Sequence, residues 1–146
     1  PTPRFPVSNR QDVLAIDRPA LRRLAAAVLS SEGLDDYRAS LVLVDNAEIL
    51  EINRRFLEHD YVTDVIAFPL DDDPDDRSCH GEVVVSAEKA LEEARTRGEP
   101  PQRELYRYVV HGLLHLAGWD DLAPADRKAM WTRQEDLLQE FCPDLK

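Results

Sequence analysis

HGLLHLAGWDD, residues 111–121, completes a helical pattern that begins near Arg103. Apolar side chains recur along this pattern at the spacing of one helix face: Leu105, Val109, Leu113 and Leu116. His111 and His115 fall on another face, about 40° apart on a helix that turns about 100° per residue. The stretch therefore predicts a helix that packs one face against a core and directs two imidazoles away from it.

The two histidines and a later carboxylate have the spacing of metal ligands. Gly118 ends the helix three residues after His115 and lets the chain turn back towards Asp121. The pattern His-x-x-x-His-x-x-Gly-x-x-Asp matches a metzincin zinc site with Asp in place of the third histidine. Such a set leaves a fourth position for a water molecule, whose pKa zinc lowers towards ~7. We predict one zinc ion per chain on His111, His115 and Asp121; the alternative is a pair of structural, hydrogen-bonded histidines.

The residue after the first histidine argues against a peptidase. Zinc proteases of the zincin type carry a glutamate there as general base, and this chain has Gly112. Met130, nine residues beyond Asp121, is interpreted as an ordinary core or surface methionine rather than as a Met-turn. A metalloprotease is therefore the weakest of the functions considered.

Length and composition fit one globular domain. The chain has 146 residues, of which 43% are hydrophobic and 32% charged, and no apolar run approaches the ~20 residues that cross a bilayer. It opens without an apolar signal segment and its two cysteines show no CxxC pairing, so we expect a cytoplasmic protein. The formal net charge of −11 argues against nucleic-acid binding over the whole surface. Five arginines within residues 1–30 form either a basic face or a solvated helix surface.

The remaining pattern predicts a single α/β (α+β) domain over residues 1–146. Helical spacing is found over residues 17–30, 46–56, 87–97 and 124–141, and short strand-like runs over residues 40–45, 63–70 and 81–86. A further strand is expected at Val13–Ile16, which gives a small mixed sheet of about four strands flanked by helices. Residues 1–12 are expected to be loose or to pair at a sheet edge, and the acidic run Asp71–Asp76 is interpreted as a solvated loop.

Three segments resemble, in order, the YbeY family, the bacterial single-strand-specific endoribonucleases of ribosomal RNA maturation. HGLLHLAGWDD is similar to the family signature HGxLHLxGYDH, with Trp119 for Tyr and Asp121 for the third His. INRRFLEHDYVTDVIAFP, residues 52–69, is similar to the block LNxxYRxxDxPTDVLSFP, and HGEVVV, residues 80–85, to the strand LGDIxI. Three ordered motifs that span most of the chain are together highly specific.

The resemblance implies a metal-dependent hydrolase with a small α/β fold and its ion on His111, His115 and, by substitution, Asp121. It further implies single-stranded or ribosomal RNA as substrate. The implied role is small-subunit ribosomal RNA maturation and ribosome quality control, beside ribosomal proteins and an assembly GTPase. Asp64 follows Thr63 in a matched block and is a candidate for orienting the attacking water, although a turn or capping role explains the pair equally well.

Two features keep a second function open. Leu57 stands where many members of the family carry an arginine thought to engage RNA, and Arg54 and Arg55 either replace it or belong to a solvated helix face. The acidic net charge also suits RNA binding poorly. The alternative to a nuclease is therefore a ribosome-assembly docking factor whose metal is mainly structural.

Overall fold

The computed structural model describes residues 4–70 and 79–144, which form one mixed sheet and the helices around it. In chain order the elements are β1 (Val7–Asn9), α1 (Arg18–Ser31), β2 (Tyr37–Val44), α2 (Asn46–Leu57), β3 (Val65–Pro69), β4 (Cys79–Ser86), α3 (Ala87–Arg97), α4 (Pro101–Leu116) and α5 (Pro124–Phe141). The sheet order is β1-β2-β4-β3, with β1, β2 and β4 parallel and β3 antiparallel to β4. The predicted fold class, a single α/β domain with a small mixed sheet of about four strands, is confirmed.

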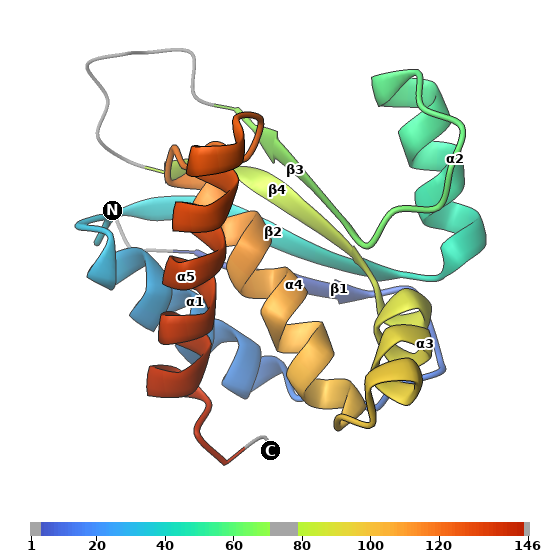
Figure 1. Cartoon of the computed structure of the whole chain (residues 1–146), viewed down its shortest axis with the longest axis horizontal. Helices are drawn as coiled ribbons and strands as arrows, with labels where there is room; N and C mark the ends of the chain where they lie inside the picture. Colours follow the sequence, from blue (N-terminus) through green and yellow to red (C-terminus); the bar gives the residue numbers. More distant parts are fainter. Residues whose placement is uncertain (1–3, 71–78, 145–146) are drawn as a thin grey trace.

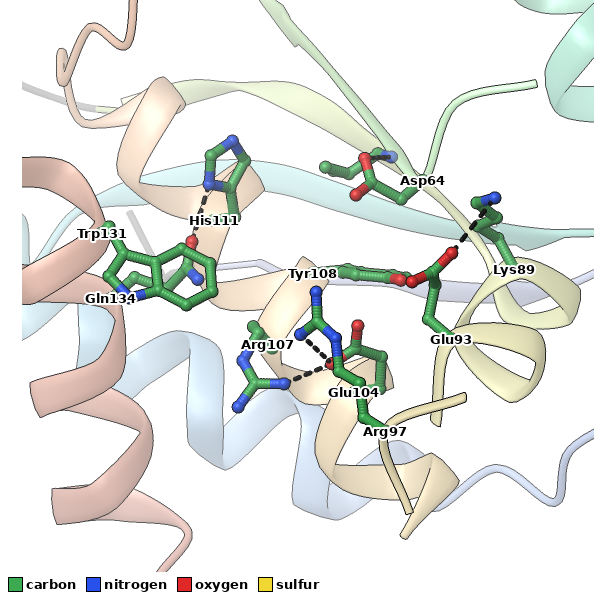
Figure 2. A pocket seen from close by; sticks show the side chains of 11 residues that line it. Asp64, Lys89, Glu93, Arg97, Glu104, Arg107, Tyr108, His111, Trp131 and Gln134 are labelled. Carbon is green, nitrogen blue, oxygen red and sulfur yellow. Dashed lines mark hydrogen bonds and ion pairs between the residues drawn. The ribbon is translucent and has the colours of Figure 1, made fainter. Parts of the chain in front are cut away.

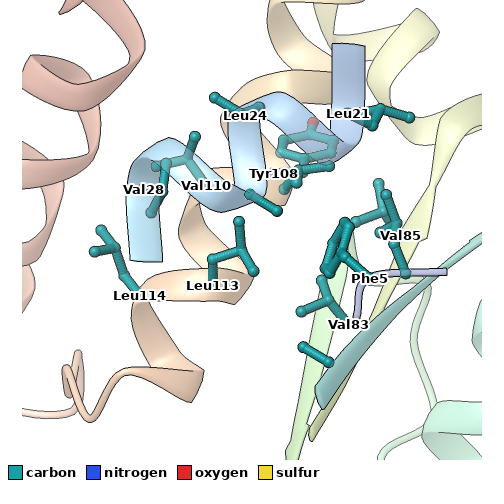
Figure 3. Close-up of a cluster of buried hydrophobic side chains, with 14 of the residues drawn as sticks. Phe5, Leu21, Leu24, Val28, Val83, Val85, Tyr108, Val110, Leu113 and Leu114 are labelled. Atoms are coloured by element: carbon teal, nitrogen blue, oxygen red, sulfur yellow. The ribbon is translucent and has the colours of Figure 1, made fainter. Parts of the chain in front are cut away.

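The sheet has a hydrophobic core on each face, and successive side chains of β2 and β4 point alternately into one core and the other. Figure 1 shows α1, α4 and α5 on one face and α2 on the other. The first face buries alternate residues of both strands: Leu41, Leu43, Val83 and Val85. Figure 3 shows Val83 and Val85 among the side chains of this core. On the other face, Val84 and Ile66 join Ile49 of α2 in a smaller cluster. Because neighbouring strand residues face opposite ways, a sheet covered on both sides needs the near-continuous apolar runs seen in the sequence.

Helix α4 lies at the centre of the larger core and contacts α1, α3, α5, β3 and β4. The apolar face predicted from the sequence is buried, with Leu105, Val109 and Leu113 fully inaccessible. The histidine face carries further buried side chains, which the apolar pattern alone does not predict: Glu104, Arg107 and Tyr108. These polar groups are buried because α3 and α5 both pack against α4.

Two helix ends fall where a capping side chain or a glycine predicts them. Asp17 caps α1 by accepting a hydrogen bond from the amide of Ala20 at 3.0 Å. Gly98 ends α3 with a φ of 67°, a left-handed conformation that glycine adopts at little cost.

The interpretation of Met130 as a packing residue is also confirmed, since it is buried in the core. None of the helices in the described residues is long and apolar enough to span a bilayer.

The expected strand at Val13–Ile16 is wrong. The side chain of Gln11 accepts hydrogen bonds from the amides of Val13 and Leu14 at 2.9 and 3.0 Å, so this backbone is satisfied without a neighbouring strand. The opening strand is β1, which pairs with β2 at the sheet edge, so part of residues 1–12 follows the edge-pairing alternative. The acidic run Asp71–Asp76 lies outside the described residues.

Gly112 is a point of close approach between α4 and the sheet. A Cβ at residue 112 would lie 2.4 Å from Cγ1 of Val83 and 3.2 Å from Cγ2 of Val65. Atoms cannot pack at 2.4 Å, so even alanine requires a shift of the helix or the strand. A glutamate after His111, as zincin proteases carry, would have no room at this position.

We expect Gly112→Ala to lower the free energy of unfolding by about 1–3 kcal/mol through overpacking, as measured by urea denaturation. Val83→Ala removes the methyl groups that the new Cβ would meet, so Gly112→Ala should be less destabilising in that background. An equal loss of stability in both backgrounds would show that the contact with Val83 is not the cause.

Candidate metal centre

His111, His115 and Asp121 bring three ligand atoms together beside the end of α4. The Nε2 atoms of the two rings lie 3.1 Å apart, and Oδ2 of Asp121 lies 3.5 Å from Nε2 of His111 and 3.3 Å from Nε2 of His115. Both histidine side chains are 26% exposed and that of Asp121 is 34% exposed, so the group is open to solvent on one side. Within residues 4–70 and 79–144, no other group of His, Cys, Asp and Glu side chains is arranged to hold a metal ion.

The separations within this group fit a four-coordinate cation. Zinc binds imidazole nitrogen and carboxylate oxygen at about 2.0–2.2 Å, and tetrahedral geometry then separates ligand atoms by about 3.3–3.6 Å. The three separations, 3.1, 3.3 and 3.5 Å, lie in or just below that range. The residues therefore fit an ion such as zinc, with three corners of the tetrahedron supplied by the chain.

The turn after α4 places Asp121 opposite the histidines. Gly118 has a φ of 104°, in the left-handed region, and its amide donates to the carbonyl of His115 at 3.0 Å. The amide of Trp119 donates to the carbonyl of Leu114, also at 3.0 Å. These bonds close the end of the helix and reverse the chain, as the glycine in the sequence predicts.

The loop that carries Asp121 is anchored to two other helices. The indole N–H of Trp119 donates to a carboxylate oxygen of Glu32, the residue that follows α1. The other oxygen of Glu32 accepts from Arg133 of α5 at 2.8 Å. The position of the loop relative to the histidines is therefore fixed by α1 and α5 together.

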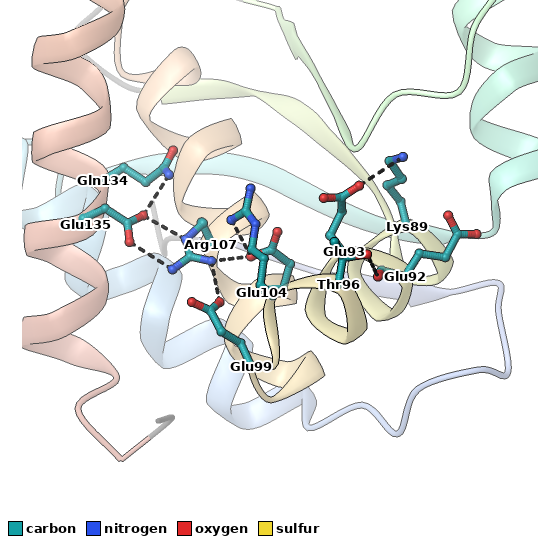
Figure 4. A network of polar contacts seen from close by, with 10 residues as sticks. Lys89, Glu92, Glu93, Thr96, Glu99, Glu104, Arg107, Gln134 and Glu135 are labelled. Carbon is teal, nitrogen blue, oxygen red and sulfur yellow. Dashed lines mark hydrogen bonds and ion pairs between the residues drawn. The ribbon is translucent and has the colours of Figure 1, made fainter.

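The protonation of the His111 ring follows from the hydrogen bonds behind it. The carboxylate of Glu135 accepts hydrogen bonds from Arg107 at 2.9 and 3.0 Å (Figure 4). Burial alone would raise the pKa of Glu135, but the hydrogen bonds from Arg107 and Gln134 outweigh burial, so the pKa is lowered. Because an ionised carboxylate only accepts, Gln134 turns its amide nitrogen to Glu135, at 3.0 Å, and its amide oxygen to His111. Nδ1 of His111 then donates to that oxygen at 2.7 Å (Figure 2). In the neutral ring, Nε2 therefore carries the free electron pair.

The ring of His115 is oriented in the same way by a backbone carbonyl. Its Nδ1 lies 3.1 Å from the carbonyl oxygen of Trp119, which can only accept, so Nδ1 is the donor, and Nε2 is the nitrogen that faces His111 and Asp121. Burial lowers the pKa of His111, which further favours the neutral ring. Two imidazole Nε2 atoms and a carboxylate oxygen thus face one another, an arrangement that suits a bound cation.

A network of buried charges supports this geometry from below (Figure 4). The guanidinium of Arg107 is 7% exposed and contacts Glu99 at 3.0 Å and Glu104, in addition to Glu135.

The sequence alone did not predict the contact of Gln134 with His111 or the role of Arg107. One available signal was that Gln134 follows Met130 by one helical turn and precedes Leu138 by another, which places an amide at a core position of α5.

A cavity of about 320 Å³ adjoins His111 and is lined by residues of α3, α4, α5 and the start of β3 (Figure 2). Asp64, the sequence candidate for orienting water, lines this cavity, and its Oδ1 accepts from the amide of Val65 at 2.8 Å. The turn role and the site role considered for Asp64 are therefore compatible.

Leu57 and its two neighbouring arginines lie elsewhere. Leu57 is 40% exposed at the end of α2. Arg54 pairs with Asp60, and Arg55 pairs with Glu51 at 3.1 Å. None of the three lines the cavity beside His111.

The fold and the cluster define an α/β protein with a His-His-Asp group that could hold a metal ion. The family model described as "Endoribonuclease YbeY" matches residues 6–142. An "Endoribonuclease YbeY" of Alkaliphilus metalliredigens is 39% identical over 144 residues, which cover 92% of this chain and 93% of that protein. One of Rhodopirellula baltica is 44% identical over 115 residues, which cover 77% of this chain and 58% of that longer protein.

The fold is also shared with a solved structure. A Thermotoga maritima protein, determined in solution, superposes with a TM-score of 0.71 at 27% identity and covers 97% of this chain and 91% of its own. The chain belongs to the YbeY endoribonuclease family. The resemblance found in the sequence is confirmed, and family membership supports an endoribonuclease role for the chain.

We expect Gln134→Leu to weaken zinc binding by about 10–100-fold, because the His111 ring loses the acceptor that fixes its proton and orientation. Competition with a chromogenic chelator measures this affinity. Gln139→Leu is the matched control, since Gln139 is exposed on the same helix. Unchanged zinc affinity in a folded Gln134→Leu variant would contradict the orienting role.

Proposed function

We propose that this chain is a zinc-dependent endoribonuclease that cuts single-stranded RNA, with one zinc ion on His111, His115 and Asp121. The observation that carries the proposal is the convergence of three ligand atoms, 3.1–3.5 Å apart, in a chain that belongs to an endoribonuclease family. The separations and the exposed side of the group both suit a catalytic rather than a closed structural ion.

His111, His115 and Asp121 would hold the zinc ion, which when bound would supply Lewis acidity and would lower the pKa of a water molecule. The chain itself orients both imidazoles through hydrogen bonds at their Nδ1 atoms, to Gln134 and to the carbonyl of Trp119, and places Asp121 beside their Nε2 atoms. His111 also lines the cavity. Asp64 lines the same cavity and interacts electrostatically with His111. We assign Asp64 the role of orienting the attacking water towards phosphorus.

Family membership supports a setting for this activity in the cell. The proposed substrate is ribosomal RNA, cut in the cytoplasm during small-subunit maturation and ribosome quality control. Small-subunit ribosomal proteins and an assembly GTPase are the proposed partners. The competing function, a docking factor with a structural metal, shares the site but requires no turnover, so an activity assay separates the two.

Cleavage of a labelled single-stranded RNA should stop with a chelator, return with added zinc, and fall by at least about a hundredfold in His115→Ala, because the chain loses the ion's charge stabilisation. Elemental analysis should find one zinc per chain in the wild type and less in Asp121→Ala. His59→Ala removes an exposed histidine outside the cluster and should change neither result. Cleavage indifferent to both chelator and His115→Ala would refute the proposal, and zinc without cleavage would favour the docking factor.

Asp64→Asn keeps the size of the side chain and removes its charge. We expect kcat to fall at least about tenfold with little change in KM or in zinc content, because water orientation acts in the reaction step. Asp60→Asn is the matched control, since Asp60 lies in the same connection between α2 and β3 and does not line the cavity. A wild-type kcat in Asp64→Asn would leave Asp64 only its turn role.

A further inference from the structure

The cavity beside His111 is a trough with a built floor and two different walls (Figure 2). Arg107 and Tyr108 of α4 form the floor, Trp131 of α5 one wall, and Lys89 and Arg97 of α3 the other. Its volume of about 320 Å³ lies within the range of sites that hold small organic groups. The proposed function gives roles to His111 and Asp64 at the edge of this cavity, but none to the residues of its two walls.

Trp131 is a large aromatic residue that the core does not enclose. It is 50% exposed, whereas Met130 beside it is 1% exposed. The Arg107 guanidinium lies 5.9 Å from its ring centroid, and Arg107 is itself held by Glu99, Glu104 and Glu135. A cation at that distance holds an aromatic ring in place. The indole is therefore a fixed apolar surface at the edge of an otherwise polar trough.

The opposite wall presents cations that retain capacity for an anion. Arg97 is 44% exposed and its one ion pair in the described residues, with Glu104, is long at 3.5 Å. Lys89 is 30% exposed and pairs along α3 with Glu93 at 3.3 Å. An exposed arginine or lysine with one long contact can donate further hydrogen bonds to a phosphate.

The trough is also less acidic than the chain as a whole. Three cations line it, Lys89, Arg97 and Arg107, and so do three carboxylates: Asp64, Glu93 and Glu104. Formal charges thus balance here, in a chain of net charge −11. A polyanion meets less repulsion in this trough than the overall charge predicts.

We propose that the trough binds the nucleotide next to the scissile bond, with its base stacked on Trp131 and its backbone phosphate on Arg97 and Lys89. The inference rests on the proposed function, since it takes RNA as the substrate. Aromatic rings beside cationic side chains are the usual means by which proteins hold single strands without reading sequence. This pocket gives an acidic chain a local means of binding RNA.

Steady-state cleavage of a single-stranded RNA by the zinc-loaded protein tests each wall. Trp131→Ala should raise KM about tenfold or more with kcat little changed, and Trp131→Phe should restore most of the loss. Arg97→Gln and Lys89→Gln should each raise KM and reduce the slope of log KM against log salt by about 0.7, as expected when one phosphate contact is lost. Two exposed positions outside the trough serve as controls, Phe56→Ala on α2 and Arg95→Gln on α3, and should behave like the wild type.

Tryptophan fluorescence supplies a readout that does not depend on cleavage. On rapid mixing with a single-stranded RNA decamer, the wild type should show quenching that Trp131→Phe lacks, and an abasic decamer should quench much less. Absence of this difference, or wild-type KM values in Trp131→Ala and Arg97→Gln, would overturn the inference while leaving the nuclease proposal intact. A wild type that quenches but never cleaves would instead support the trough and refute the proposed function.

Discussion

The close approach of α4 to the sheet at Gly112 fixes the position of the whole site. Because residue 112 has no side chain, the helix lies directly against Val83 and Val65. This contact fixes the rotation of the helix about its own axis. At that rotation, His111 and His115 point towards the loop that carries Asp121. A larger residue at 112 would push the helix away from the sheet and shift both rings. A packing constraint in the core thus determines the geometry at the surface.

Hydrogen bonds between buried polar side chains determine which nitrogen of His111 carries a proton. Arg107, Glu135 and Gln134 form a chain of hydrogen bonds that ends on His111, and each member leaves the next only one satisfactory orientation. Among the described residues, no buried side-chain nitrogen or oxygen lacks a hydrogen-bond partner. Buried polar networks of this kind stabilise a structure only when they are complete. The charges under α4 therefore serve to hold one ring in one tautomer.

Periodicity and spacing predicted most of the fold and the approach of the ligands, since both depend on local sequence. Helix α5, the Asp17 cap and the turn at Gly118 follow from residues within a few positions of one another. Contacts between distant segments were not predictable in this way. Gln134 contacts His111 only because α5 packs on α4. The apolar pattern of Val13–Ile16 is typical of a strand, but that pattern does not show that the side chain of Gln11 accepts hydrogen bonds from the amides of Val13 and Leu14. The ligand roles of His111, His115 and Asp121 remain a proposal, although the structure brings these side chains together.

If the proposed zinc ion binds His111, His115 and Asp121, the supply of zinc would also affect how long the folded chain survives. A ligand that binds only the native state adds RT ln(1 + [L]/Kd) to its stability, about 4.1 kcal/mol at a thousand times Kd. Under that proposal, cells short of zinc would lose not only the activity of this protein but also copies of it, by degradation of the less stable ion-free chain.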